Sequence, residues 1–226
     1  MRTQSNDPDR LDMKSEAIQI LYRAVRMISF IPSVGRYNMT ICHLKKFIWF
    51  RVAKVGTRTI LNHLKENEVP LDVEHGNWLH YPEISFDSYF KFGFVRNPWD
   101  RLISCWHNKV VKENYFRFEN YTHEKMKTFE NFVNFVSDLN IDKCDRHLRS
   151  QSALIDLNMV DYLGRMETFD VDANYIFQKL GLPEKQIARK NVTSDKKSYE
   201  IYYDEHLAKK VALIYQKDIQ IFGYQF

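Results

Sequence analysis

One stretch constrains the fold more than any other, because an apolar run passes through a short polar turn into a helix. Phe47–Phe50 has the aromatic and β-branched composition of a buried strand, and Thr59–Lys65 has apolar residues at helical spacing. Gly56, in the turn, lets backbone amides approach a ligand closely. Free N–H groups and the dipole at a helix start attract anions, so the turn is a candidate phosphate loop. An ordinary turn between a strand and a helix remains the alternative interpretation.

The order of residues in this turn argues against a nucleoside triphosphate site. Such a site needs a lysine directly after the second glycine of G-x-x-x-x-G-K-[ST]. Here Lys54 precedes the single Gly56, which favours a loop for one phosphate. We expect Lys54 to add positive charge at the mouth of the loop and Thr57 and Thr59 to cap the helix. The predicted phosphate-binding residues are Lys54, Val55, Gly56, Thr57, Arg58 and Thr59.

A second strand followed by a helix occurs further along the chain. Tyr89–Val95 is an apolar run typical of a strand, Pro98 stands where a helix begins, and Asn97 can cap that helix. Arg96 therefore leaves the end of a strand and points at the crevice. An arginine fork grips phosphate oxygens in pairs, and the Ser104 hydroxyl supplies another donor. Ser104 lies about two turns into the helix, so it shares a phosphate with Arg96 only if the helix runs back past the site.

Two histidines are candidates for a general base. Leu71–His75 alternates as a short strand would, which places His75 near a strand end, where ligands bind in α/β sheets. A neutral imidazole, with an unperturbed pKa of about 6.5, can take the proton from an acceptor hydroxyl. His80 is the second candidate. Either histidine could instead be an ordinary surface or hydrogen-bonded residue.

The two strand-to-helix units together resemble the carbohydrate sulfotransferases, the group of chondroitin 4-sulfotransferase and heparan 2-sulfotransferase. The sequence Arg-Asn-Pro-Trp-x-Arg-Leu-x-Ser, beginning at Arg96, resembles their 3′-phosphate motif, and Lys54–Thr59 resembles their 5′-phosphosulfate loop. The resemblance implies that Arg96 and Ser104 bind the 3′-phosphate of the donor, 3′-phosphoadenosine 5′-phosphosulfate (PAPS). It implies an α/β fold with a central, mainly parallel sheet flanked by helices, similar to that of P-loop kinases. In relatives the base histidine precedes the 3′-phosphate motif, which supports His75.

The resemblance extends over most of the chain, from Phe47 to Phe226. Asp145–Ser152 resembles a family segment near the active-site opening, which implies that His147, Arg149 and Gln151 contact the acceptor or order the site, although a polar loop needs no ligand to explain it. Glu167 lies in another family segment, where it is structural or orients a basic residue. Three further expectations are a late loop over the nucleotide that includes Lys196 and Lys197, a possible structural ion pair for Arg101, and a structural core role for the helix that begins at Phe129.

We expect one domain over residues 1–226, with an N-terminal helix and linker in 1–46 and a catalytic core in 47–226. Within the first part, apolar spacing predicts a helix over 11–31 and a connecting loop over 33–46. In the core, a strand is expected over 159–167, a helix over 171–180 and one final helix over 204–224.

The predicted activity is transfer of a sulfuryl group from PAPS to a hydroxyl, most favourably of a carbohydrate, leaving adenosine 3′,5′-bisphosphate. His75 deprotonates the acceptor, and Lys54 neutralises charge on the departing phosphate. No metal is expected, because Lys54 and the loop dipoles stabilise the leaving group. Two alternatives remain: a nucleotide kinase-like phosphotransferase, and a non-catalytic module that binds anionic ligands and has no need of His75.

Composition bounds the partners and the cellular compartment. The chain carries 33 basic and 29 acidic residues, a mixed surface that suits an anionic small molecule better than nucleic acid. No membrane span is expected, because the most apolar N-terminal stretch is broken by Arg23 and Arg26. Three cysteines without C-x-x-C spacing favour reduced thiols and a cytoplasmic protein, with a lumenal domain of a longer protein as the alternative.

Overall fold

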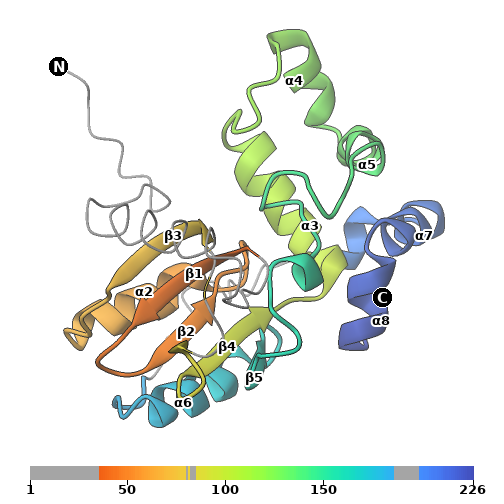
Figure 1. Ribbon diagram of the computed structural model, residues 1–226. Coiled ribbons are helices and arrows are strands. Elements are labelled where there is room, and N and C mark those ends of the chain that lie inside the picture. Colours follow the sequence, from red (N-terminus) through yellow and green to blue (C-terminus); the bar gives the residue numbers. More distant parts are fainter. Residues whose placement is uncertain (1–35, 80, 82–84, 186–198) are drawn as a thin grey trace, which may run out of the picture.

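The computed structural model describes residues 36–79, 81, 85–185 and 199–226. Within them, a five-stranded sheet has the strand order β3-β1-β2-β4-β5 (Figure 1). Strands β2, β4 and β5 pair in parallel, whereas β1 is antiparallel to both β2 and β3. Strand β3 therefore runs in the same direction as the parallel strands, and the predicted mainly parallel sheet is confirmed. The strands are β1 (Tyr37–Cys42), β2 (Phe47–Phe50), β3 (Val73–Leu79), β4 (Phe90–Val95) and β5 (Tyr162–Arg165).

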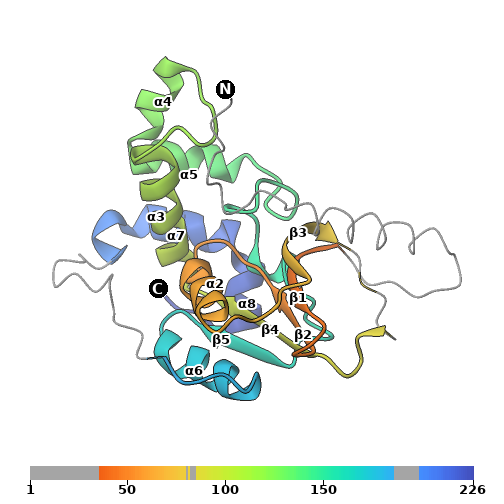
Figure 2. The same ribbon diagram turned by 90° about the vertical axis from the view of Figure 1, so that its left-hand side faces the viewer.

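Helices flank the sheet and also gather beyond one end of it. Helix α2 packs against α6, with the rings of His63 and Phe177 4.0 Å apart, while α3, α4, α5 and α7 cluster away from the strands (Figures 1 and 2). Their bounds are α2 (Thr57–Glu66), α3 (Pro98–Trp106), α4 (Asn120–Met126), α5 (Phe129–Ser137), α6 (Phe169–Lys179), α7 (Glu205–Ile214) and α8 (Gln216–Phe222). Shorter turns are the π-helical η2 (His107–Val111) and the 3₁₀ turns η3 (Gln151–Ala153) and η4 (Tyr199–Tyr202).

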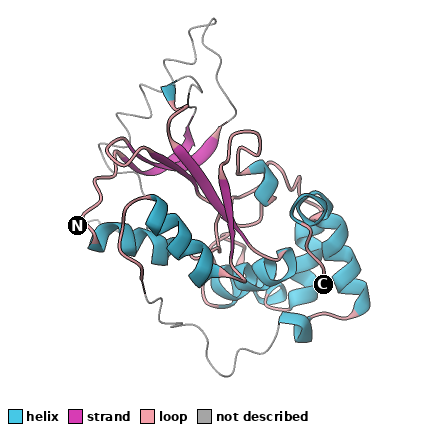
Figure 3. Ribbon diagram, turned by 90° about the horizontal axis from the view of Figure 1, so that it is seen from below, coloured by secondary structure: helices cyan, strands magenta, loops and turns pink. Residues whose placement is uncertain are grey.

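The core lies on the twisted sheet, whose strands Figure 3 shows from below. All four residues of β2 are buried, as expected for a strand covered on both faces. Trp49 of β2 stacks on Phe92 of β4, with ring centroids 5.9 Å apart. Burying such large aromatic surfaces on neighbouring strands stabilises the sheet at the place where the chain leaves it for the candidate site.

Several expected boundaries are wrong. The connecting loop expected over 33–46 contains β1, which is buried from Asn38 to Cys42 and lies inside the sheet. The strand expected over Leu71–His75 lies further along, at Val73–Leu79. The strand expected over 159–167 is only β5. The single final helix is two, because Tyr215 departs from helical geometry with φ −107° and ψ 26°.

Some expectations fall outside the described residues. These are the helix over 11–31, His80, and the late loop with Lys196 and Lys197. No helix within the described ranges combines the length and apolar character needed to cross a membrane. All three cysteines are free thiols.

Candidate active site

The turn after β2 has a strained backbone that leads into α2. Lys54 and Gly56 both have positive φ, 72° and 78°. Glycine adopts this region freely, but for a lysine it costs roughly 1–2 kcal/mol. A Cβ on Gly56 would lie 2.5 Å from the Phe169 ring, so only glycine fits there. Gly56 is also the N-cap, and the Thr57 hydroxyl donates to the Val52 carbonyl, so the expectation that threonines cap this helix is wrong.

The Lys54 ammonium group is half-buried and faces η2, the π-helical turn that follows α3. Its Nζ donates to Oδ1 of Asn108, 3.0 Å away. The pKa of Lys54 is lowered to about 8, mainly by burial and in addition by the nearby cations Arg96, Lys109 and Arg58. The ammonium therefore lies close to its titration range at neutral pH while remaining mostly charged.

Arg96 lies directly against the same turn. It follows the last residue of β4 and is only 7% exposed. Its Nε and Nη2 each donate to the Asp100 carboxylate at 2.7 Å, and its Nη1 donates to the Lys54 carbonyl at 3.2 Å. The structure thus brings together the two segments in which the sequence analysis placed phosphate-binding residues.

Helix α3 and η2 run past the phosphate loop. Asn97 caps α3 as predicted, accepting from the Trp99 amide at 3.0 Å. Arg96, Asp100, Ser104 and Asn108 recur every four residues, which places them on one side of the helix. Arg96 and Asn108 both contact Lys54, so Ser104 lies on the stretch between two contacts with the loop. Helix α3 therefore runs back past the loop, and the role of Ser104 as a ligand of the 3′-phosphate stays a prediction.

The backbone around Arg96 is held by two residues from other parts of the chain. Gln151 accepts from the Arg96 amide at 2.9 Å and donates to the Arg96 carbonyl at 2.8 Å. Glu167 accepts from the Asn97 amide at 2.6 Å, so its role is structural. The fully buried Asp218 carboxylate in turn accepts from the amides of Gln151 and Ser152. Sequence reasoning noted the segment that contains Gln151 but gave Asp218 no role, since only the folded chain brings it close.

Arg101 does not form the ion pair considered for it. Its guanidinium is 2% exposed and donates to three backbone carbonyls: Ala53 at 3.1 Å, Arg149 at 2.9 Å and Arg146 at 3.1 Å. One side chain therefore joins the phosphate loop to the loop that precedes η3.

His75 lies in the middle of β3 and not at its end. Its Nδ1 is 2.7 Å from Nη1 of Arg51, and its Nε2 is 3.1 Å from a carboxylate oxygen of Glu74. A guanidinium only donates hydrogen bonds, so Nδ1 accepts and the proton sits on Nε2. Both ring nitrogens of the neutral imidazole are thus engaged, and His75 can act as a base only if the bond from Arg51 to Nδ1 opens.

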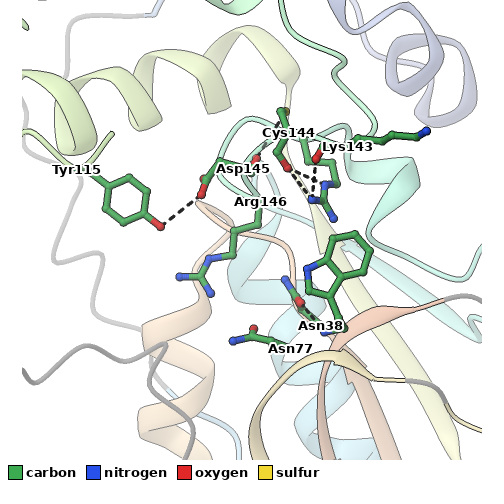
Figure 4. Close-up of a pocket in the computed structure, with 9 residues that line it drawn as sticks. Asn38, Asn77, Tyr115, Lys143, Cys144, Asp145 and Arg146 are labelled. Carbon is green, nitrogen blue, oxygen red and sulfur yellow. Dashed lines mark hydrogen bonds between the residues drawn. The ribbon is translucent and has the colours of Figure 1, made fainter. Parts of the chain in front are cut away.

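A pocket of about 510 Å³ lies beside these elements, between β3 and the segment 143–149 (Figure 4). Arg149 lines it, stacks over Trp78 at 4.2 Å and donates to the Cys144 and Lys143 carbonyls. His147 is not among the lining residues; its Nδ1 lies 2.8 Å from Asp145, and burial lowers its pKa. The lining residues are Asn38, Asn77, Trp78, Tyr115, Lys143, Cys144, Asp145, Arg146 and Arg149.

The part of the chain that the structure describes contains no group of three or more histidine, cysteine or carboxylate side chains able to hold a metal ion. The cations of the site are Lys54, Arg58, Arg96 and Lys109, which lie around the turn after β2 and around α3 with η2.

A model of the sulfotransferase family matches residues 37–225. The chain belongs to the sulfotransferase family. The match begins at β1, which the sequence analysis had placed outside the catalytic core. It therefore includes the phosphate loop, the Arg96 turn and the pocket segment in a single family domain.

Several curated relatives of this sulfotransferase-family chain carry carbohydrate sulfotransferase names. Mouse carbohydrate sulfotransferase 11 is 26% identical, over 70% of this chain and 54% of its own length. Zebrafish carbohydrate sulfotransferase 14 is 28% identical, over 60% of this chain and 44% of its own. Human carbohydrate sulfotransferase 10 is 25% identical, over 89% of this chain and 71% of its own length. The chain spans about half the length of mouse carbohydrate sulfotransferase 11. No solved structure matches it.

Proposed function

We propose that this protein transfers a sulfuryl group from PAPS to a hydroxyl group of a carbohydrate. The observation that carries the proposal is the contact of Arg96 with the Lys54 carbonyl, which joins the candidate 3′-phosphate arginine to the candidate 5′-phosphate loop. Family membership and the names of the relatives support the reaction class and the acceptor class. The cytoplasmic location and the lack of a nucleic-acid partner stay predictions.

The residues present fit a nucleotide with two separate phosphate groups. The Thr57 and Arg58 amides at the start of α2 point out of the helix without an intrahelical acceptor, whereas the Thr59 amide donates to the Gly56 carbonyl at 3.0 Å. Gly56 lets a phosphate approach the first two amides. Arg96 commits three of its five N–H groups to Asp100 and Lys54, which leaves two for a second phosphate. Ser104 adds a hydroxyl on the same side of α3. PAPS would supply the activated sulfuryl group at the 5′ end.

Lys54 would stabilise the negative charge that develops on the departing phosphate. A cation fixed in a half-buried site does this with little reorganisation. Its pKa of about 8 leaves most molecules protonated at neutral pH. For proton removal from the acceptor, His75 and His80 both stay candidates. His75 would first have to release Arg51, which donates to the lone pair of Nδ1.

The pocket beside β3 would hold the acceptor. Trp78 is 44% exposed and offers an apolar ring face, while Arg146, which also lines the pocket, offers positive charge. The amide oxygen of Asn77 is buried without a hydrogen-bond partner among the described residues. Asn77 as a residue lines the pocket, and the N–H groups of its amide are donors for a hydroxyl-rich ligand such as a sugar.

The test is isothermal calorimetry with adenosine 3′,5′-bisphosphate and, separately, ATP with magnesium. We expect selective binding of the bisphosphate, and Arg96→Ala should weaken it at least tenfold, since a charge-assisted phosphate contact contributes about 2 kcal/mol. Lys209→Ala, which removes an exposed positive charge on α7, is the control and should bind normally. Equal or absent binding of the two nucleotides contradicts the proposal, and magnesium-dependent binding of ATP supports the kinase-like alternative.

A further inference from the structure

Lys54 is held at two points by α3 and its continuation. Arg96 binds the backbone carbonyl of Lys54, and Asn108 binds its ammonium group. Arg96 belongs to a motif that the sequence reveals. Asn108 belongs to none of the segments that the sequence analysis singled out, so its contact with the candidate catalytic lysine calls for its own explanation.

Asn108 lies where the helix changes geometry. The chain is α-helical to Trp106 and π-helical from His107 to Val111, with the Lys112 amide donating to the His107 carbonyl five residues earlier at 3.1 Å. Such widened turns are rare and frequently occur at functional sites. The turn is anchored on both sides of Asn108, because His107 contacts the Tyr202 hydroxyl at 3.1 Å and Val110 is fully buried.

The charges around Lys54 indicate what the amide oxygen of Asn108 does: it accepts a hydrogen bond from an ammonium group that lies among other cations. The groups that act on the ammonium are three cations, Arg96, Lys109 and Arg58, and the thiol of Cys105. Within the described residues, Asn108 is the hydrogen-bond acceptor that the structure gives Nζ. An ammonium has three N–H donors, so one bond to Asn108 leaves two for an anion in the phosphate loop.

We propose that Asn108 is a positioning residue, whose amide oxygen holds the Lys54 ammonium at the mouth of the phosphate loop for the 5′-phosphosulfate group. The inference rests on the proposed function for the identity of the ligand. The hydrogen bond itself is a property of the protein without ligand, so the two can be tested separately.

The first measurement is an NMR titration of the Lys54 side chain in the ligand-free protein. A hydrogen bond to the charged form favours that form, so Asn108→Leu should lower the pKa of Lys54 by about one pH unit. Asn108→Asp keeps an acceptor of the same size and adds a negative charge, so it should raise the pKa of Lys54. A local packing defect has no reason to give opposite shifts in the two variants. An unchanged pKa of Lys54 in both variants overturns the proposal.

The second measurement is calorimetry of the same variants with adenosine 3′,5′-bisphosphate. Asn108→Leu should weaken binding about fivefold, the loss of one modest hydrogen-bond contribution. The matched control is Asn134→Leu on α5, which removes a similar bond from Asn134 to Lys210 and should leave both readouts unchanged. If the pKa of Lys54 shifts but binding is equal in wild type and Asn108→Leu, the positioning role is wrong. Failure of the wild-type protein to bind the nucleotide would instead refute the proposed function.

Discussion

The phosphate loop with α3 and the pocket beside β3 lie next to each other but are built differently. At the phosphate loop, charged side chains leave the end of a strand or one side of a helix and bond to other polar groups of the site: Arg96 to Asp100, Lys54 to Asn108. In the pocket, Arg149 uses its guanidinium on carbonyls of its own loop. Periodic elements therefore fix the first region, and bonds from side chains to carbonyls fix the second.

Arg101 connects the two regions, since its three bonds reach Ala53 on one side and Arg146 and Arg149 on the other. Arg101 is therefore one residue through which the two regions depend on each other, beside Lys109 of η2, which lies over the ring of the pocket residue Tyr115. The predictions below test that dependence, beginning with the change expected to have the largest effect.

Replacement of Arg101 should damage both regions together. Arg101→Met keeps the apolar stem but removes the donor from one buried and two partly buried carbonyls, so we expect the free energy of unfolding to fall by at least about 3 kcal/mol. Chemical denaturation measures this loss. Lys209→Met, at an exposed ion pair on α7, is the comparison and should change stability by less than about 0.5 kcal/mol. A small effect at Arg101 would mean that the two regions are independently stable.

Replacement of Trp78 should affect the pocket beside β3 and leave the phosphate loop unaffected. Trp78→Ala removes the exposed ring face of the pocket, so we expect the KM for a carbohydrate acceptor to rise about tenfold, roughly 1.4 kcal/mol. The affinity for adenosine 3′,5′-bisphosphate should change less than twofold, because no bond of the phosphate loop involves Trp78. Sulfate transfer to a panel of sugars provides the acceptor, and Trp78→Phe should retain most of the activity. An equal loss in nucleotide affinity would join the pocket to the nucleotide site.

The smallest expected effect is on nucleotide affinity, when Asp100 beside Arg96 is replaced. The Asp100 carboxylate occupies two N–H groups of Arg96 and repels an incoming phosphate. Asp100→Asn keeps an oxygen acceptor but removes the charge, so nucleotide affinity should rise about threefold, the modest size expected for a partly exposed pair. Calorimetry at low and high salt checks this, because the gain should shrink as salt screens the charge. Weaker binding would show that Asp100 mainly orients Arg96.

The parts of the fold that the sequence predicted are those governed by local rules. The two strand-to-helix units carry their signals within a few residues: apolar runs, Gly56, and an asparagine before a proline. Strand β1 carried no comparable signal, because its place inside the sheet depends on pairing with β2 and β3. The position of His75 was missed for a related reason, since the strand continues past Gly76 to Leu79.

The candidate site divides in the same way. Arg96 and Lys54 could be proposed from motifs, and the structure brings them into contact. The support of Arg96 by Gln151, and of Gln151 by Asp218 from 67 residues away, could not be predicted, because those bonds exist only after the chain has folded. Polar side chains that bond to distant backbone leave no periodic pattern in a sequence.

The bonds of Arg101 have a consequence for how such proteins diversify. Two of its three partners are peptide carbonyls of the segment that lines the pocket, and every amino acid supplies such a carbonyl. Side chains at positions 143 and 146 can therefore be exchanged without loss of the acceptor groups that Arg101 needs, provided Arg149 keeps the backbone on its path. Grafting this segment from a relative is thus a route to a new acceptor preference that leaves the nucleotide site intact.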